Sequence, residues 1–249
     1  MSGHSKWSSI KHKKAKKDAQ RGKLFSKLVR KITLEAKQGG GEVEKNPSLR
    51  LIVEQAQEVG MPKENIKKAI QRGTGELPGV DYEELSIEGY GPGGTALLIE
   101  TVTDNRRRTI AEVRHLLTSH GGHIGEAGCV NWLFDRKGTL VLDKTKIQED
   151  KAMELAIELE AEDVREDEQA IEVIFPPGQF NSAQEKIKEY GLPSDMLSLG
   201  MIPQTTVPLE EKEALQMLKL MEVLEEAEEV ENIYANFDIP DEIMERAFE

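Results

Sequence analysis

The chain has 249 residues, 38% of them hydrophobic and 32% charged, and a formal net charge of -13. This length suits two or three domains, and the apolar content excludes wholesale disorder. The single cysteine, Cys129, excludes an intrachain disulfide, and no apolar run approaches the roughly 20 residues of a membrane span, so we expect a cytoplasmic protein without membrane contact.

The positive charge is concentrated at one end of the chain. Residues 1–75 hold 18 Lys and Arg against 7 acids, whereas residues 76–249 hold 15 against 39. Residues 1–37 alone hold twelve basic residues and two acids. A basic end on an acidic chain is typical of a protein that binds a polyanion there. A transit peptide is the lesser alternative, because this start resembles part of a folded helical unit.

The N-terminal part is predicted to be all-helical. Residues 1–20 have few apolar positions, which predicts a helix with little core face. From Leu24, apolar residues at helical spacing predict an amphipathic helix that ends at Gly39. Asn46 is a plausible N-cap for a second helix, and a third opens after Gly60. The predicted basic helical domain covers residues 1–77.

After residue 78 the apolar period changes to two. The predicted elements are strands at 82–87 and 95–102, a helix at 109–120, strands at 130–134 and 139–142, a helix at 147–159, strands at 163–165 and 170–175, a helix at 180–190, a strand at 196–202, a helix at 209–225 and a strand at 230–237. Residues 135–205 follow the β-α-β-β-α-β order of a ferredoxin-like unit. Element counting leaves open whether this unit is inserted into a middle domain of residues 78–134 and 206–249.

Several motifs in fixed order resemble the YebC family. They are GHSKW at 3–7, IKHKKAKKDAQRGK at 10–23, NPSLR at 46–50, MPKENI at 61–66, RGTGE at 72–76, EGYGPGG at 88–94, TDNRRRT at 103–109, EVRH at 112–115 and WLFDRKG at 132–138. The resemblance spans the whole chain. It implies an α+β fold of three domains: an all-helical N-terminal domain and two ferredoxin-like α/β units, one inserted in the other. It also implies a bacterial transcriptional regulator, with relatives that act as mitochondrial translational activators.

The basic N-terminal segment supplies most of the candidate nucleic-acid-binding residues. They are His4, Lys6, Trp7, Lys11, His12, Lys13, Lys14, Lys16, Lys17, Arg21, Lys23, Lys27 and Arg30. Lys and Arg neutralise phosphates, and an indole can stack on an unpaired base. The plainer alternatives are a solvated helix face for the cations and a core position for Trp7.

A second candidate set is Arg106, Arg107 and Arg108 at a predicted helix start. Arginines there oppose the helix dipole, which favours phosphate contact over a purely structural role. Arg114 extends the patch on the same helix. The alternative is salt bridging to this chain's many acids.

Two other patterns are weaker evidence for a functional site. The glycines at 89, 91 and 94 fit a dinucleotide motif formally, but a strand-like segment follows them, so we expect a hairpin turn with Tyr90 exposed. The spacings among His115, His120, His123, Glu126 and Cys129 match no familiar zinc site. We therefore expect no metal, and no cofactor.

No catalytic motif accompanies the basic segment, so we expect a non-enzymatic nucleic-acid-binding regulator, a DNA-binding transcription regulator. The alternative is a translation factor bound to ribosomal RNA. We detect no evident helix-turn-helix with a polar recognition face, which favours RNA slightly.

Overall fold

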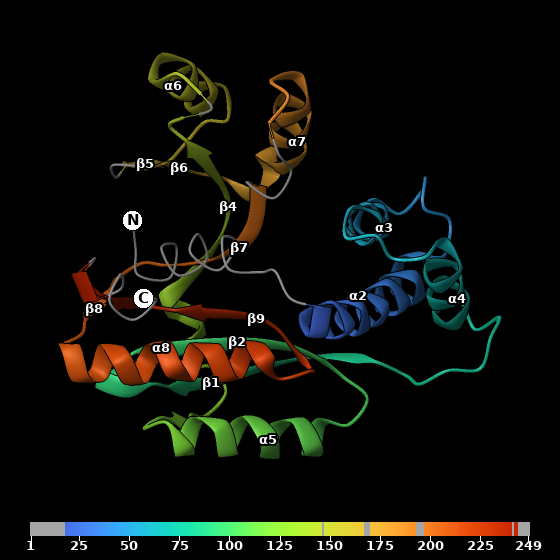
Figure 1. The fold of residues 1–249 in the computed structure, drawn as a ribbon, viewed down its shortest axis with the longest axis horizontal. Coiled ribbons are helices and arrows are strands. Elements are labelled where there is room, and N and C mark those ends of the chain that lie inside the picture. The colour runs from blue at the N-terminus through green and yellow to red at the C-terminus, as the bar shows by residue number, and fades with distance from the viewer. Residues whose placement is uncertain (1–17, 146, 167–169, 193–196, 241, 244–249) are drawn as a thin grey trace.

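The computed structural model describes residues 18–145, 147–166, 170–192, 197–240 and 242–243. Figure 1 shows a group of helices at one side, a sheet backed by two helices, and a second sheet with two helices of its own. This is the predicted α+β fold, with an all-helical N-terminal part and one α/β unit inserted in the other.

Over the described residues, the N-terminal part is built from three helices around one core. The helices are α2 (Asp18–Gly39), α3 (Pro47–Glu58) and α4 (Lys63–Gly73). Their core side chains are Leu28, Ile32 and Ala36 of α2, Leu49, Val53 and Ala56 of α3, Met61, and Ile66 and Ala69 of α4. The predicted N-cap is confirmed, since the Asn46 side chain accepts a hydrogen bond from the Leu49 N–H at 3.1 Å. Its amide also donates to the carbonyls of Glu35 and Gly40, which ties α3 to the end of α2.

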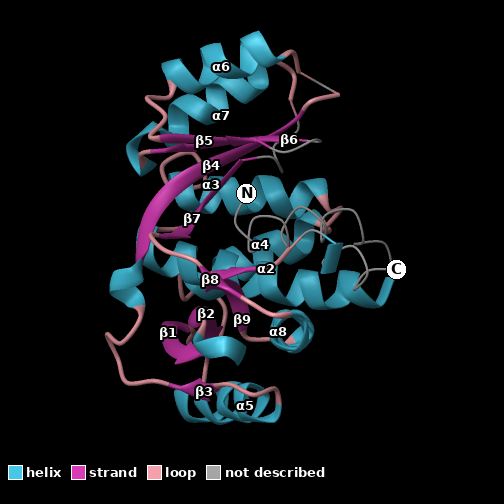
Figure 2. Ribbon diagram, turned by 90° about the vertical axis from the view of Figure 1, so that its left-hand side faces the viewer, coloured by secondary structure: helices cyan, strands magenta, loops and turns pink. Residues whose placement is uncertain are grey.

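The middle unit is a four-stranded antiparallel sheet. Its strands are β1 (Glu83–Tyr90), β2 (Ala96–Thr103), β3 (His123–Ile124) and β9 (Val230–Ala235), in the order β3-β1-β2-β9. Helices α5 (Arg106–Ser119) and α8 (Glu211–Glu226) cover one face, where Leu97, Ile99, Leu117 and Leu220 are fully buried (Figure 2). Strand β9 thus completes a sheet whose first strand lies more than a hundred residues earlier in the chain, and α8 covers a face of that sheet.

The inserted unit has the predicted β-α-β-β-α-β order. Its elements are β4 (Phe134–Asp143), α6 (Glu149–Glu158), β5 (Asp163–Glu166), β6 (Ala170–Phe175), α7 (Phe180–Glu189) and β7 (Leu197–Pro203). The antiparallel strand order is β5-β6-β4-β7, and α6 and α7 pack together on one face over Leu140, Val173 and Phe175. The middle unit also consists of a sheet with helices on one face. Its strand order differs from that of the inserted unit, because β1 and β2 form a direct hairpin.

The two α/β units meet at the start of β4, the first strand of the inserted sheet. Phe134 packs with Ala96, Leu98 and Tyr234 on the sheet face opposite α5 and α8. A short parallel pair, β8 (Val207–Pro208) with β10 (Phe237–Asp238), closes the return to the middle unit. The domain bounds at residues 77, 134 and 205 stay a prediction. Over the described residues, no helix has both the length and the apolarity to span a membrane.

Several element boundaries differ from the sequence prediction. Residues 130–133 are not a strand: a 3-10 turn occupies Asn131–Leu133, and β4 begins at Phe134. The N–H groups of Val130 and Asn131 bind the Glu88 side chain instead of a strand. The helix predicted from Thr109 begins at Arg106, and the first amphipathic helix already includes Asp18. The last predicted strand is divided at residue 236.

Candidate nucleic-acid interface

Residues 1–20 of the basic N-terminal segment form what we call the N-terminal arm, and most of the candidate residues in and next to it lie outside the described residues. These residues are His4, Lys6, Trp7, Lys11, His12, Lys13, Lys14, Lys16 and Lys17, and only the backbone of Arg21 is described. Their contact with nucleic acid stays a prediction.

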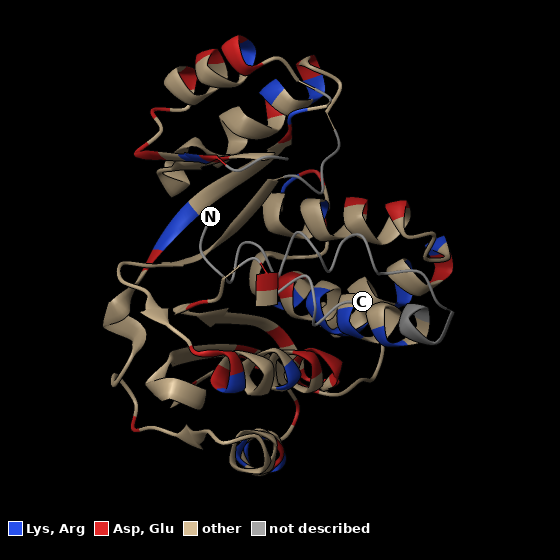
Figure 3. Cartoon of the chain, turned by 60° about the vertical axis from the view of Figure 1, so that its left-hand side comes forward, with Lys and Arg blue, Asp and Glu red and all other residues tan. Residues whose placement is uncertain are grey.

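The basic face of α2 lies against the C-terminal end of α8 (Figure 3). The Nζ of Lys27 donates to the carbonyl oxygens of Glu225 at 3.0 Å and Val230 at 2.6 Å, and Lys23 lies 3.4 Å from the carbonyl of Glu226. The last carbonyls of a helix lack intrahelical donors and carry the negative end of its dipole, so an ammonium group is favoured there. These lysines therefore join the helical part to the middle unit.

Two further cations of α2 reach the same turn. Arg30 donates to the carbonyl oxygen of Glu228 at 2.6 Å and also pairs with its carboxylate, and its side chain is only 12% exposed. Lys31 pairs with the buried Glu231 at 3.2 Å. Phosphate contact by Lys27 or Arg30, as predicted from sequence, would require this docking to open.

The arginines at the start of α5 have different surroundings. Arg106 pairs with Glu83 at 3.1 Å. Arg108 pairs with Asp104 and with the buried Glu229. These carboxylates offset the unfavourable placement of positive charge at a helix N-terminus. The salt-bridge alternative raised by the sequence therefore accounts for two of the three arginines.

Arg107 and Arg114 are left over from this pairing. Both are exposed, and across the described residues neither has an ion pair or a side-chain hydrogen bond. Seven residues are close to two helical turns, so both side chains leave the same outer face of α5. That face presents two exposed guanidinium groups on residues about 10 Å apart along the helix axis.

The glycine-rich loop at 89–94 turns the predicted hairpin between β1 and β2, with Gly93 at φ 70°. Since a strand follows the glycines, they do not open a helix over a dinucleotide. The expected exposure of Tyr90 is wrong. Its ring is half-buried and stacks on His123 at a centroid distance of 5.3 Å, and its hydroxyl donates to the Cys129 carbonyl at 3.5 Å.

The loop before β4 is fixed by one carboxylate. Glu88 accepts hydrogen bonds from the N–H groups of Gly128 at 2.6 Å, Val130 at 2.7 Å and Asn131 at 2.8 Å. Burial opposes ionisation here, but the three backbone donors outweigh it and lower the pKa of Glu88. The loop presents Trp132, which is 66% exposed and which the sequence pattern does not single out.

The cations of α4 are also missing from the candidate residues chosen from the sequence. Lys63, Lys67, Lys68 and Arg72 are exposed, and none of them has an ion pair in the described part of the chain. Glu64 is the one acid on this helix. A charge count includes these cations, but no motif singles them out, because their exposure is established only when the helix turns Ile66 and Ala69 into the core.

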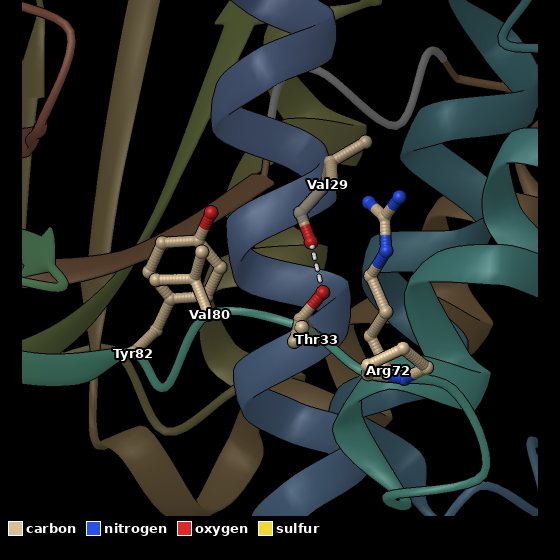
Figure 4. A pocket seen from close by; sticks show the side chains of 7 residues that line it. Val29, Thr33, Arg72, Val80 and Tyr82 are labelled. Carbon is tan, nitrogen blue, oxygen red and sulfur yellow. Dashed lines mark hydrogen bonds between the residues drawn. The ribbon is translucent and has the colours of Figure 1, made fainter.

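A cavity of about 250 Å³ lies beside α4 (Figure 4). It is lined by Val29 and Thr33 of α2, Arg72 of α4, and Pro78, Gly79, Val80 and Tyr82 of the linker. Figure 4 shows Tyr82 and Arg72 on opposite sides of Thr33. A Cβ at Gly79 would lie 3.1 Å from Cγ of Arg72, so the linker backbone packs directly on the arginine stem and holds it at the end of α4.

The histidines near β3 have local contacts. His120 Nδ1 lies 2.8 Å from the Leu116 carbonyl, and His123 stacks on Tyr90. Among the residues with described positions, no three His, Cys, Asp or Glu side chains are grouped as metal ligands would be.

Comparison with known families covers nearly the whole chain. Residues 5–76 match the family described as "TACO1/YebC protein N-terminal domain", and residues 82–237 match "TACO1/YebC second and third domain". The chain belongs to the TACO1/YebC family. Two bacterial members of this family carry the name "Probable transcriptional regulatory protein". The one from Syntrophus aciditrophicus (strain SB) is 51% identical over 247 residues, which is 99% of each chain. The one from Dictyoglomus turgidum (strain DSM 6724 / Z-1310) is 51% identical over 246 residues, 98% of this chain and 99% of the other.

A crystal structure of a conserved hypothetical protein from Aquifex aeolicus has the same fold. It matches with a TM-score of 0.84 at 45% identity, covering 93% of this chain and 96% of that one. The names of the TACO1/YebC relatives describe regulatory proteins and not enzymes.

Proposed function

We propose that this TACO1/YebC protein is a non-enzymatic, cytoplasmic nucleic-acid-binding protein that regulates transcription through DNA. The names of its relatives support the regulatory role. The excess of Lys and Arg in residues 1–75 supports a polyanionic ligand, because cations that neutralise phosphates release counterions and so supply affinity.

The observation that carries this proposal is the division of the arginines on α5. Arg106 and Arg108 are matched by carboxylates, whereas Arg107 and Arg114 face solvent without a partner among the described residues. An unpaired arginine contributes little to folding, but its planar fork matches phosphate oxygens. The outer face of α5 is therefore assigned to phosphate contact, together with the N-terminal arm.

The test reverses one of these charges. Arg107→Glu should weaken binding to a duplex DNA of mixed sequence and reduce the salt slope of log K by about 1. The melting temperature should not fall, because Arg107 holds no described protein group and a glutamate is favoured in the first turn of a helix. Lys151→Glu on α6 is the matched control, since Lys151 is also exposed and has no ion pair in the described structure. A loss of stability that matches the loss of binding would show a structural role instead.

The alternative function is a translation factor bound to ribosomal RNA. The resemblance to mitochondrial translational activators suggests it, and the same cations suit either phosphate backbone. Sedimentation of a cell lysate through a sucrose gradient, after DNase or RNase treatment, separates the two. Loss of fast-sedimenting protein with DNase supports DNA binding, whereas co-migration with ribosomes that survives DNase overturns it.

A further inference from the structure

Helices α3 and α4 are joined by a tight turn. Four residues, Val59–Pro62, separate them. In Figure 1 α3 is seen nearly end-on while α4 is seen from the side, so their axes are far from parallel. Two helices that cross steeply over a turn of three or four residues are the geometry of a helix-turn-helix.

The turn itself is specified by backbone hydrogen bonds. The N–H of Met61 donates to Ala56 O at 2.8 Å, the N–H of Gly60 donates to Gln57 O at 2.9 Å, and Gly60 has φ 78°. This pair of bonds around a left-handed residue is a Schellman motif, which ends α3 abruptly. Met61 is 4% exposed and belongs to the helical core, so the turn is also held from inside.

The two faces of α4 are sharply different. Ile66 and Ala69 are buried against α2 and α3. The exposed residues are four cations and an amide, namely Lys63, Asn65, Lys67, Lys68 and Arg72; helical spacing places Lys67, Lys68 and Arg72 on the outer side, with Lys63 and Asn65 flanking it. In the described part of the chain these four cations have no carboxylate partner, unlike Arg30 and Lys31 of α2. Figure 1 places α4 at the edge of the molecule, on the side away from both sheets.

We propose that α3 and α4 form a helix-turn-helix in which α4 enters the major groove of duplex DNA. The inference rests on the proposed function, since it requires a nucleic-acid ligand, and it selects B-form DNA as that ligand. This proposal departs from the sequence-based expectation, which found no evident helix-turn-helix with a polar face. It rests on the placement of Ile66 and Ala69 in the core, which leaves the cations of α4 exposed.

The roles of individual residues follow from the docking geometry of this motif. The N-terminal residues of the second helix contact base edges, while the first helix crosses the backbone. Lys63, Asn65 and Lys67 lie in that part of α4. Lysine binds the O6 and N7 of guanine, and asparagine binds the N6 and N7 of adenine. Arg72, whose stem packs on Gly79 at the other end of α4, is placed for a phosphate.

The shape of the groove separates DNA from RNA. The major groove of B-form DNA is about 12 Å wide and admits a helix. The major groove of A-form RNA is deep and narrow, so side chains on a helix cannot read it. A protein that binds through α4 must prefer duplex DNA over duplex RNA of the same sequence.

The experiment uses the full-length protein and two labelled duplexes of one mixed sequence, one of DNA and one of RNA. Binding is followed by fluorescence anisotropy over a range of salt concentrations. The variant is Lys67→Ala with Lys68→Ala. The control is Lys151→Ala with Lys212→Ala, which removes the same charge from two exposed lysines on α6 and α8. Melting temperatures should agree among all three proteins, because each replaced side chain is exposed.

We expect the wild-type protein to prefer DNA, and the Lys67/Lys68 variant to lose that preference. Its salt slope on DNA should fall by roughly 0.9 for each lost contact, while the control keeps the wild-type slope. Equal binding of both duplexes by the wild type, or unchanged DNA binding by the variant, would overturn the helix-turn-helix and leave the proposed function standing. Binding to neither duplex would overturn both.

A second variant tests base contact directly. Asn65→Ala should change the sequences that the protein selects from a randomised duplex pool, because an asparagine that reads adenine carries sequence information and a phosphate contact does not. An identical selected set for wild type and Asn65→Ala would remove Asn65 from the base contacts. Failure of either protein to enrich any sequence would contradict groove reading by α4.

Discussion

Arg107 and Arg108 are neighbours in the chain, yet their side chains serve different ends. Arg108 is fixed between Asp104 and the buried Glu229, which also accepts a hydrogen bond from the Thr109 hydroxyl. A buried carboxylate without such partners is costly, so Arg108 belongs to the fold. Arg107 is exposed and has no ion pair or side-chain hydrogen bond in the described structure. Charge alone does not separate them; their side-chain partners do.

Glu88 gives a prediction at the same scale. Glu88→Gln removes the negative charge that three backbone N–H groups share, so the free energy of unfolding at neutral pH should fall by about 1–2 kcal/mol. The pKa of Glu88 is lowered in the folded protein, so its contribution is present above the ordinary carboxyl pKa and is lost as the pH falls through the lowered value. Denaturant unfolding at several pH values measures the difference.

The gap between wild type and Glu88→Gln should therefore close in acid. Glu54→Gln on α3 is the control, because Glu54 is exposed and has no ion pair among the described residues. It should change the stability by less than about 0.5 kcal/mol at every pH. A gap at Glu88 that is constant with pH would show that the carboxylate charge does not hold the loop.

At the scale of elements, α2 and α8 are joined by electrostatic contacts. Lys27→Ala should lower the free energy of unfolding by about 1–3 kcal/mol, because it removes a charged donor from the carbonyls of Glu225 and Val230. Lys45→Ala is the control: Lys45 pairs with Glu42 at the surface, where an ion pair stabilises by less than about 1 kcal/mol. Thermal unfolding compares the two. Equal, small losses would mean that α2 is held to α8 by other contacts.

The sequence predicts elements well where local signals decide them. The three N-terminal helices follow from apolar spacing, and the cap at Asn46 follows from residue type. The turn at 131–133 does not, because it depends on Glu88, which lies more than forty residues earlier. The engagement of α2 is equally hidden, since Lys27 and Arg30 meet a turn about two hundred residues away. Composition shows that cations are present, but only tertiary contacts show which remain unpaired.

At the scale of the whole molecule, the insertion and the charge distribution belong together. The middle sheet is closed by β9 after the inserted unit, which brings the acidic end of α8 next to α2 (Figure 3). Several cations of residues 1–75 are paired with carbonyl or carboxylate oxygens at this contact. The other cations of residues 1–75 include those of α4 and of the N-terminal arm, which is the segment with the greatest excess of Lys and Arg; Arg107 and Arg114 on the outer face of α5 add to them.

The claim that this excess binds a polyanion is tested most directly by the salt dependence of binding. The measurement is the slope of log K against log salt for a duplex DNA, with the wild type and with Lys13, Lys14, Lys16 and Lys17 all changed to Ala. If these lysines contact phosphates, we expect the slope to flatten by roughly 0.9 for each contact that the variant loses. An unchanged slope would contradict it.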